Sequence, residues 1–318
     1  MSKIDYKWFN MDIMLNPTAI FILDYPDAMP SAKYGIQDLL TIANFQAEQN
    51  VFACHPLTAT ALSSTLDGES IIFVPPSLSR QLPSFSNPET LSLLKNGHRS
   101  GSTIVAACAG VFWLANAGLL DGKQVTTHWM LCDELKNNFQ HIEKVNKCDM
   151  VVDQGDIVTA AGLYAYQDLT LHLIARFAGF ALAKKVADYS LLDLKGRLQS
   201  YYQRFYPKLN HGDHLIIQAQ QLFSKHIYSN ISILQVAEHC HLSQRTLLRR
   251  FTQATGYSPK HYFIHLKVEK AKQLIELNNL SIAEIGYKLS YSDTSNFFKQ
   301  FKQVAGITPA EFRSRQFL

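Results

Sequence analysis

The segments FTQATGYSPKHY (251–262) and FKQVAGITPAEF (301–312) determine how the second half of this chain folds. Both follow the pattern F-x4-G-x2-P-x2-[YF], and the second copy is displaced from the first by 50 positions. The repeat extends upstream, where SILQ (232–235) and SIAE (281–284) have the spacing of a capping box. In such a box, a serine and an acid or amide three residues later satisfy free N–H groups at a helix start. The sequence therefore predicts two copies of one helical unit.

The first copy has the pattern of a helix-turn-helix unit. A helix that begins at Ser232 is interrupted at CHL (240–242) and restarts after Ser243, which is a favourable N-cap residue. Because Leu247 and Phe251 are four residues apart, they share one face of the following helix, and we expect that face to be buried. The opposite face then presents Gln244, Arg245 and Arg249.

The second copy repeats this arrangement. Its first helix begins at Ser281, a turn follows at LSY (289–291), and Asp293 caps the second helix. Three aromatic side chains of that helix are expected to point inward or toward a neighbouring helix, namely Phe297, Phe298 and Phe301. The outer face presents Thr294, Ser295, Asn296 and Lys299. Side chains at the start of such a helix can reach base edges in the major groove of DNA, which is about 12 Å wide.

Residues 220–317 resemble the DNA-binding domain of the AraC/XylS family of transcriptional regulators. The resemblance covers the tandem helix-turn-helix plan and the F-x4-G-x2-P signature, and it is carried by RTLLRRF, GYSPKHYF, YSDTSNFFKQFK and GITPAEFR. It implies that the long helix at about 261–277 places two recognition helices in successive major grooves, about 34 Å apart. It also implies phosphate contacts from Arg250 and Lys260, and base contacts from Arg245, Arg249 and Lys299. For each arginine, a solvated charge on a helix surface is the alternative.

One position departs from the family pattern. Ser290 stands in the second turn, where the family usually has glycine because the turn favours a positive φ. A serine held at positive φ is strained by roughly 1 kcal/mol, so we expect Ser290 to lower stability rather than to abolish DNA binding.

The charge is unevenly distributed along the chain. Residues 212–318 hold 13 Lys and Arg against 7 Asp and Glu, whereas residues 1–211 hold 17 against 19. Since neutralising DNA phosphates requires cations in only one domain, this asymmetry favours a DNA-binding half joined to a sensing half. The length of 318 residues and the 47% hydrophobic content suit about two globular domains.

The first half alternates short apolar runs with amphipathic stretches. Helical spacing is found at 36–46 and 169–189, which with the strands predicts a wound α/β sheet of the flavodoxin-like type, followed by an all-α domain. Residues 1–192 are therefore expected to form the sensing domain, 193–213 a linker, and 214–318 the DNA-binding domain. The predicted strands are AIFIL (19–23), SIIFV (70–74), STIVAA (102–107), MVV (150–152) and DIVTA (156–160), the last two flanking a Gln154-Gly155 turn.

Cys108 has the setting of a nucleophile elbow. It follows an apolar strand and precedes a helix that starts with the small residues Ala109 and Gly110, and His128 comes 20 positions later. The stretch 103–130 resembles the PfpI and class I glutamine amidotransferase-like fold. The segments AGLLDG, TTHW and AAGLYAYQDLTLHL resemble the N-terminal half of the GlxA subgroup of AraC-type regulators.

Catalysis and ligand sensing are alternative functions for this cysteine. Enzymes of the fold need an acid from the first helix beside the cysteine, and a gapless alignment places Ser31 there, with Asp24 and Asp27 nearby. We therefore expect Cys108 and His128 to line a ligand pocket in a protein that is not an enzyme. A PfpI-like cysteine hydrolase or amidase with a DNA-binding appendage is the alternative, and purely structural roles for both residues are a third.

The expected function is that of a sequence-specific DNA-binding transcriptional regulator, with activation as the favoured direction, that responds to a small metabolite. Its expected partners are double-stranded promoter DNA, a small effector, RNA polymerase and a second copy of the chain as a homodimer. The resemblance implies a nitrogenous effector. The five scattered cysteines lack zinc-ligand spacing, so we expect no metal and no cofactor. Neither a signal peptide pattern nor a membrane-spanning apolar run is found, so we expect a cytoplasmic protein without a membrane partner.

Overall fold

The computed structural model describes residues 16–58, 70–79, 85–194 and 197–315. The chain divides into two compact units, Met1–Gln199 and Ser200–Leu318. Within the described ranges, no helix is both long and apolar enough to cross a membrane.

The first unit is built on a six-stranded sheet in the order β2-β1-β3-β4-β8-β7. Neighbouring strands are parallel except β7, which pairs antiparallel with β8 through the expected turn at Gln154-Gly155. A smaller parallel pair, β5 and β6, lies outside this sheet. The strands are β1 (Thr18–Asp24), β2 (Phe52–Thr58), β3 (Ile71–Val74), β4 (Thr103–Ala107), β5 (Gln124–Thr126), β6 (Lys144–Asn146), β7 (Val151–Asp153) and β8 (Ile157–Ala160).

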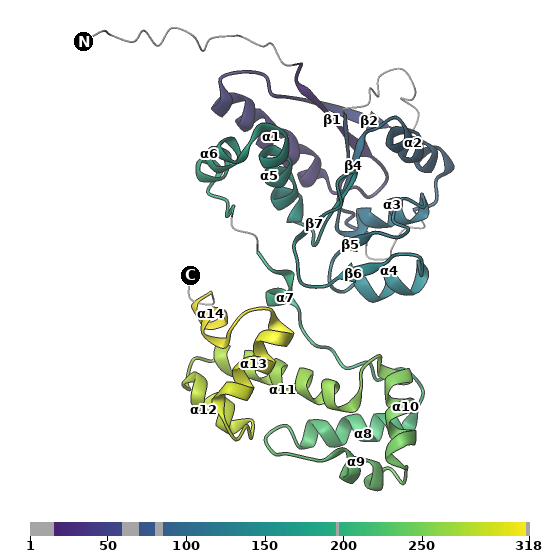
Figure 1. Ribbon diagram of the computed structural model, residues 1–318, viewed down its shortest axis with the longest axis vertical. Coiled ribbons are helices and arrows are strands. Elements are labelled where there is room, and N and C mark those ends of the chain that lie inside the picture. Colours follow the sequence, from purple (N-terminus) through teal and green to yellow (C-terminus); the bar gives the residue numbers. More distant parts are fainter. Residues whose placement is uncertain (1–15, 59–69, 80–84, 195–196, 316–318) are drawn as a thin grey trace, which may run out of the picture. The chain divides into compact units, whose positions relative to one another are not determined.

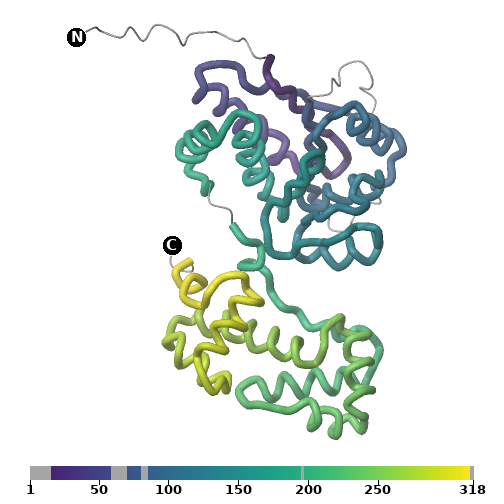
Figure 2. The backbone as a smooth tube through the Cα atoms, in the orientation of Figure 1, coloured from purple at the N-terminus to yellow at the C-terminus, as the bar shows by residue number. Residues whose placement is uncertain are grey.

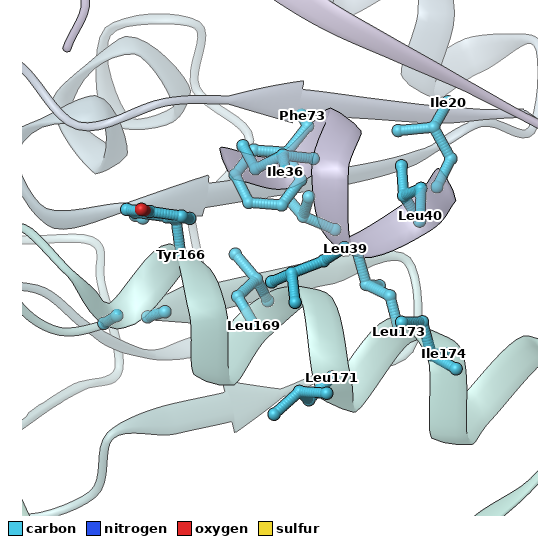
Figure 3. Close-up of a cluster of buried hydrophobic side chains, with 14 of the residues drawn as sticks. Ile20, Ile36, Leu39, Leu40, Phe73, Tyr166, Leu169, Leu171, Leu173 and Ile174 are labelled. Atoms are coloured by element: carbon cyan, nitrogen blue, oxygen red, sulfur yellow. The ribbon is translucent and has the colours of Figure 1, made fainter. Parts of the chain in front are cut away.

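Helices cover both faces of the sheet, as Figure 1 shows. On one face, Ile36 of α1 and Leu169 of α5 belong to the same buried apolar cluster as Ile20 of β1 and Phe73 of β3 (Figure 3). Each such side chain that is fully buried stabilises the fold by about 1.5–3 kcal/mol. The helices of this face are α1 (Pro30–Ala47), α5 (Ala165–Ala178) and α6 (Phe180–Ser190). The opposite face carries α2 (Pro88–Arg99), the short 3₁₀ turn η1 (Cys108–Gly110) and α3 (Val111–Asn116), and α4 (Cys132–Asn138) lies beside β6.

All five predicted strands and the wound α/β architecture are confirmed, with three differences. The predicted helix 169–189 is wrong as a single helix, because Gly179, at φ 92° and ψ 151°, ends α5 and starts α6. The apolar spacing continues across this glycine, so periodicity alone does not show the break. Strand β2 was not predicted, because it contains Pro56 and exposes His55, which an edge strand tolerates. The short strands β5 and β6 were not predicted either.

The second unit is helical and consists of two similar groups of helices on either side of α11. Figure 2 follows the chain from the first group, in green, through α11 to the second group, in yellow. The first group comprises α8 (His214–Lys225), α9 (Ile233–His239) and α10 (Gln244–Thr255). The connecting helix is α11 (Pro259–Glu276), and the second group comprises α12 (Ile282–Lys288), α13 (Thr294–Ala305) and α14 (Pro309–Ser314). A further short helix, α7 (Gln199–Tyr202), spans the boundary between the units.

The repeated signature describes how one helix ends and the next begins. Gly256 ends α10 at φ 78°, a left-handed conformation that glycine adopts without strain. Ser258 then caps α11, and Pro259 occupies the first helical turn, where its missing N–H is not needed. The outer residues of the signature, Phe251 and Tyr262, are buried together. The second copy uses Gly306, Thr308, Pro309, Phe301 and Phe312 in the same way. Both predicted capping boxes, at Ser232 and Ser281, are present.

The turn inside each helix-turn-helix unit contains a non-glycine residue with positive φ, His241 at 54° and Ser290 at 61°. The expected positive φ at Ser290 is therefore confirmed. Its hydroxyl donates a hydrogen bond of 2.6 Å to the carbonyl of Tyr228, which offsets part of the strain. Ser290 lacks the conformational freedom of glycine, but its hydroxyl bonds to the loop before α9, which a glycine could not do.

Candidate DNA-binding surface and effector site

The outer face of α10 is polar and open. Leu247 and Phe251 are fully buried, whereas Gln244, Arg245 and Arg249 are exposed, as the sequence predicted. Leu248 was not predicted as part of this face, although its side chain is 44% exposed. Because it lies three residues after Arg245 and directly before Arg249, it shares their side of the helix. An exposed leucine there can contact the methyl group of thymine.

The outer face of α13 repeats that of α10. Ser295, Asn296 and Lys299 are exposed and Thr294 is half-buried, while Phe297 and Phe301 are fully buried. Phe298, which was also expected to point inward or toward a neighbouring helix, is half-buried, and its ring lies 5.9 Å from that of the adjacent Phe297, centroid to centroid. The displacement of 50 positions that relates the two copies pairs Lys299 with Arg249 and Phe298 with Leu248. Because Phe298 was expected to pack inward, the repeat alone does not show that Leu248 is exposed, and its place on the outer face comes from the structure.

A groove of about 590 Å³ separates the two helix-turn-helix groups. It brings together Lys260, in the first turn of α11, and Asn296, in the first turn of α13. The Asn296 amide oxygen also accepts a hydrogen bond of 3.1 Å from Gln300. Lys260 is exposed and near the open groove, so its ammonium is available to an anion.

Arg250, the other predicted phosphate contact, is bound within the fold. Its Nε and Nη2 donate hydrogen bonds of 2.9 and 2.7 Å to the two carboxylate oxygens of Asp213. Asp213 in turn caps α8 by accepting a bond from the Ile216 amide, and the Arg250 hydrogen bonds lower the pKa of Asp213. This bidentate pair ties α10 to the start of α8.

In the first unit, Cys108 occupies a sharp turn between β4 and α3. Its φ is 54°, its side chain is 4% exposed, and it opens the turn η1. A Cβ atom on Gly110 would lie 2.4 Å from the Pro75 carbonyl oxygen, so only glycine fits there. Positive φ at the cysteine and small residues after it are the geometry of a nucleophile elbow.

The elbow does not activate the thiol. Burial raises the pKa of the Cys108 thiol to about 11, although hydrogen bonds from the backbone amides of Ala109 and Gly162 act in the opposite direction. Because the thiolate is the nucleophile, a protonated thiol is unreactive near neutral pH. Burial also lowers the pKa of His128, and its Nδ1 accepts a hydrogen bond of 3.2 Å from the Met130 amide. Burial thus favours the neutral form of the ring, and the bond from Met130 favours the tautomer with the proton on Nε2.

Gly162 brings Cys108 and His128 into one site. Its amide binds the sulfur, and a Cβ atom on it would lie 4.0 Å from the His128 ring. Across the part of the chain that the structure describes, no hydrogen bond joins Cys108 directly to His128. The two residues thus face a common space without forming a nucleophile and base pair.

Two further parts of a hydrolytic site, the acid beside the cysteine and the N–H donors of an oxyanion hole, are not found at the expected positions. Ser31, where the acid was expected, is an exposed residue in the first turn of α1. Asp24 is instead bound by Lys33 at 2.7 Å. The loop after β3 begins with Pro75 and Pro76, which have no N–H to donate to an oxyanion.

The described residues include no group of three or more His, Cys, Asp or Glu side chains arranged to hold a metal ion. All five cysteines are free thiols, and Cys108, Cys132 and Cys240 are buried.

Comparisons with known proteins agree with both halves of this description. Residues 236–315 match the Helix-turn-helix domain family, and residues 82–176 match the DJ-1/PfpI family. The transcriptional regulator ArgR of Pseudomonas aeruginosa is 29% identical over 299 residues, covering 90% of this chain and 84% of ArgR. GlxA of Rhizobium meliloti is 27% identical over 230 residues, which cover 70% of this chain and 68% of GlxA. An AraC family regulator from Pseudomonas putida aligns with 55% of this chain and 99% of its own, at 22% identity and a TM-score of 0.46.

The fold and the two exposed helix faces define a helix-turn-helix DNA-binding protein joined to a wound α/β domain. The chain is a transcriptional regulator with an AraC-type DNA-binding region and a DJ-1/PfpI-like N-terminal domain, similar to ArgR and GlxA.

Proposed function

We propose that this regulator reads its operator through the outer faces of α10 and α13, under the control of a small effector bound beside Cys108 and His128. The observation that carries the first part is the repetition of one exposed face on two helices at a fixed displacement in the chain. Two equivalent reading faces on one rigid unit suit two successive major grooves of a duplex.

We divide the side chains into those that contact base edges and specify sequence, and those that contact the phosphate backbone of DNA. Gln244, Arg245, Leu248 and Arg249 are assigned to base edges of the first half-site. Thr294, Ser295, Asn296 and Lys299 are assigned to the second. Lys260 is assigned to a phosphate, because it lies in the groove between the reading faces. Arg250 is assigned to the fold, because its guanidinium forms a bidentate ion pair with Asp213.

We also infer that the first unit binds its effector without chemical turnover. The support is a buried thiol whose pKa is raised to about 11, a histidine whose pKa burial lowers and which shares no hydrogen bond with that thiol among the described residues, and prolines in the β3 loop. Cys108 and His128 both lie near Gly162, at the carboxyl ends of β4 and β8, and these are the side chains that we expect a reversibly bound effector to contact.

The thiol pKa gives a direct test of this inference. With folded protein at pH 7.5, iodoacetamide should alkylate the exposed Cys148 well before Cys108, as followed by peptide mass spectrometry. Because burial raises the Cys108 pKa, its thiolate should form and react only as the pH approaches about 11. In urea the two cysteines should react at similar rates. Faster labelling of Cys108 than of Cys148 at pH 7.5 would show an activated nucleophile and favour the hydrolase alternative.

A short chain of hydrogen bonds supports control of DNA binding by this site. The Thr127 hydroxyl donates to the Cys108 carbonyl at 2.7 Å. The neighbouring Thr126 hydroxyl accepts a bond of 2.9 Å from Nε2 of Gln199, the last residue of the first unit. A ligand that displaces the Cys108 turn therefore acts on the segment that continues into the DNA-binding unit.

Two substitutions test this coupling in the full chain. Cys108→Ser should leave operator affinity within about twofold, and it should change the thermal shift given by amino acids and quaternary amines. Thr126→Val should keep that thermal shift and weaken the effect of the same compounds on operator affinity, because it removes the nearest of the three oxygens that accept from the Gln199 amide. Loss of operator binding by folded Cys108→Ser without any compound present would contradict the separation of roles.

A further inference from the structure

The connecting helix α11 buries two lysines, Lys267 and Lys272, which are 5% and 2% exposed. Lysine is rarely buried without a partner. Within the described residues, no carboxylate forms a salt bridge with either ammonium, and burial lowers the pKa of both lysines to about 8. Each is held instead by carbonyl oxygens and aromatic rings, so each must serve a contact that an apolar side chain cannot make.

Lys267 contacts both helix-turn-helix groups. Its Nζ donates a hydrogen bond of 2.8 Å to the carbonyl of Leu289, which ends α12 in the second group. It donates another of 3.0 Å to Oδ1 of Asn230, in the loop between α8 and α9 of the first group. The rings of Phe263 and Tyr291 face the same ammonium at 4.8 and 5.2 Å.

Further hydrogen bonds near Lys267 join the loop before α9 to the turn after α12. The side-chain amide of Asn230 donates a hydrogen bond of 3.1 Å to the carbonyl of Ser290. The Ser290 hydroxyl donates one of 2.6 Å to the carbonyl of Tyr228. Residues 228–230 and 289–291 are far apart in the chain and belong to groups on either side of α11 (Figure 1). This cluster of bonds is therefore a cross-link between the two reading units, with Lys267 at its buried centre.

We propose that Lys267 is a positioning residue that fixes the separation and rotation of α10 relative to α13, and thereby sets the operator spacing that the regulator accepts. The proposal rests on the proposed DNA-reading role of both helices. One base pair changes the distance between two half-sites by about 3.4 Å and their relative rotation by about 34°. Reading units that are locked together should reject such a change, whereas unlocked units should tolerate it.

Lys272 provides a matched control on the same helix. It is equally buried, but its Nζ bonds the carbonyl of Gln203 at 2.7 Å and that of Ser200 at 3.5 Å, both before α8. Lys272→Met should therefore destabilise the unit in a similar way without removing the link between 228–230 and 289–291. Asn230→Ala removes the bonds that the Asn230 side chain forms with Lys267 and Ser290, at an exposed residue where the effect on folding is small.

The experiment uses the full chain and the duplex that the wild type selects from a random pool, with one base pair inserted or deleted between the two protected subsites. Affinities are measured by fluorescence anisotropy, and circular dichroism confirms that each variant is folded. Wild type and Lys272→Met should favour the selected spacing by about tenfold or more, a difference of the size of one mismatched base pair. Lys267→Met and Asn230→Ala should accept all three spacings within about threefold.

The outcomes separate this inference from the proposed function. A wild type that selects no sequence overturns both. A wild type that selects a sequence and ignores the spacing overturns the inference alone. Folded Lys267→Met and Asn230→Ala that keep a tenfold preference also overturn it, as does an equal loss of preference in Lys272→Met.

Discussion

DNA binding by the full chain should weaken about 10³-fold when the salt concentration rises from 50 to 200 mM. Each phosphate that a cation neutralises releases counterions, and about six such contacts produce a loss of this size. Residues 212–318 contain 13 Lys and Arg. Four of these are engaged inside the fold, namely Arg250, Lys267, Lys272 and Arg313. The remaining cations are enough for about six phosphate contacts together with base contacts.

Fluorescence anisotropy titrations at four salt concentrations measure this effect as the slope of log affinity against log salt. Each phosphate contact contributes about −0.9 to the slope. Arg250→Ala is the control, because its charge is held by Asp213 and its loss should leave the slope nearly unchanged. A slope near zero for folded wild-type protein would contradict electrostatic binding by the second unit.

Features that depend on local rules could be predicted from the sequence. The helix starts at Ser232, Ser243, Ser281 and Asp293 follow from side chains that satisfy free amides, and all four are present. The inner face of α10 follows from the spacing of its apolar residues. The elbow at Cys108 follows from small residues placed between a strand and a helix. In each case the residues that cause the structure are within a few positions of it.

Features that depend on distant partners could not be predicted. Arg250 was expected to contact a phosphate because its charge was taken to be free. The ion pair with Asp213 could not be anticipated, because Asp213 lies 37 positions away in the chain. Lys267 and Lys272 were not singled out, because the carbonyls that allow their burial come from other parts of the chain. The prolines beside Cys108 are adjacent to it only because β3 pairs with β4. The exposure of Leu248 on the outer face of α10 became evident only from the structure.

Arg249→Ala should remove sequence discrimination at one or two base pairs of the first half-site, by a factor of about 5 to 150. An arginine that bonds a guanine edge typically supplies about 1–3 kcal/mol of discrimination, and replacing it leaves that edge unread. Arg249 is exposed on the outer face of α10, four residues from Arg245, so the two can act on neighbouring bases. Lys260→Ala should instead weaken binding to all sequences about equally and reduce the salt slope by about one.

The measurement is a set of binding curves for both variants against single-base substitutions of the selected duplex, at two salt concentrations. Lys260→Ala serves as the matched control, since it also removes one exposed cation from the second unit but lies in the groove between the helix groups. If Arg249→Ala weakened every duplex by the same factor, Arg249 would be a backbone contact. Sequence reading by the first half-site would then rest on Gln244, Arg245 and Leu248, the other exposed side chains on the outer face of α10.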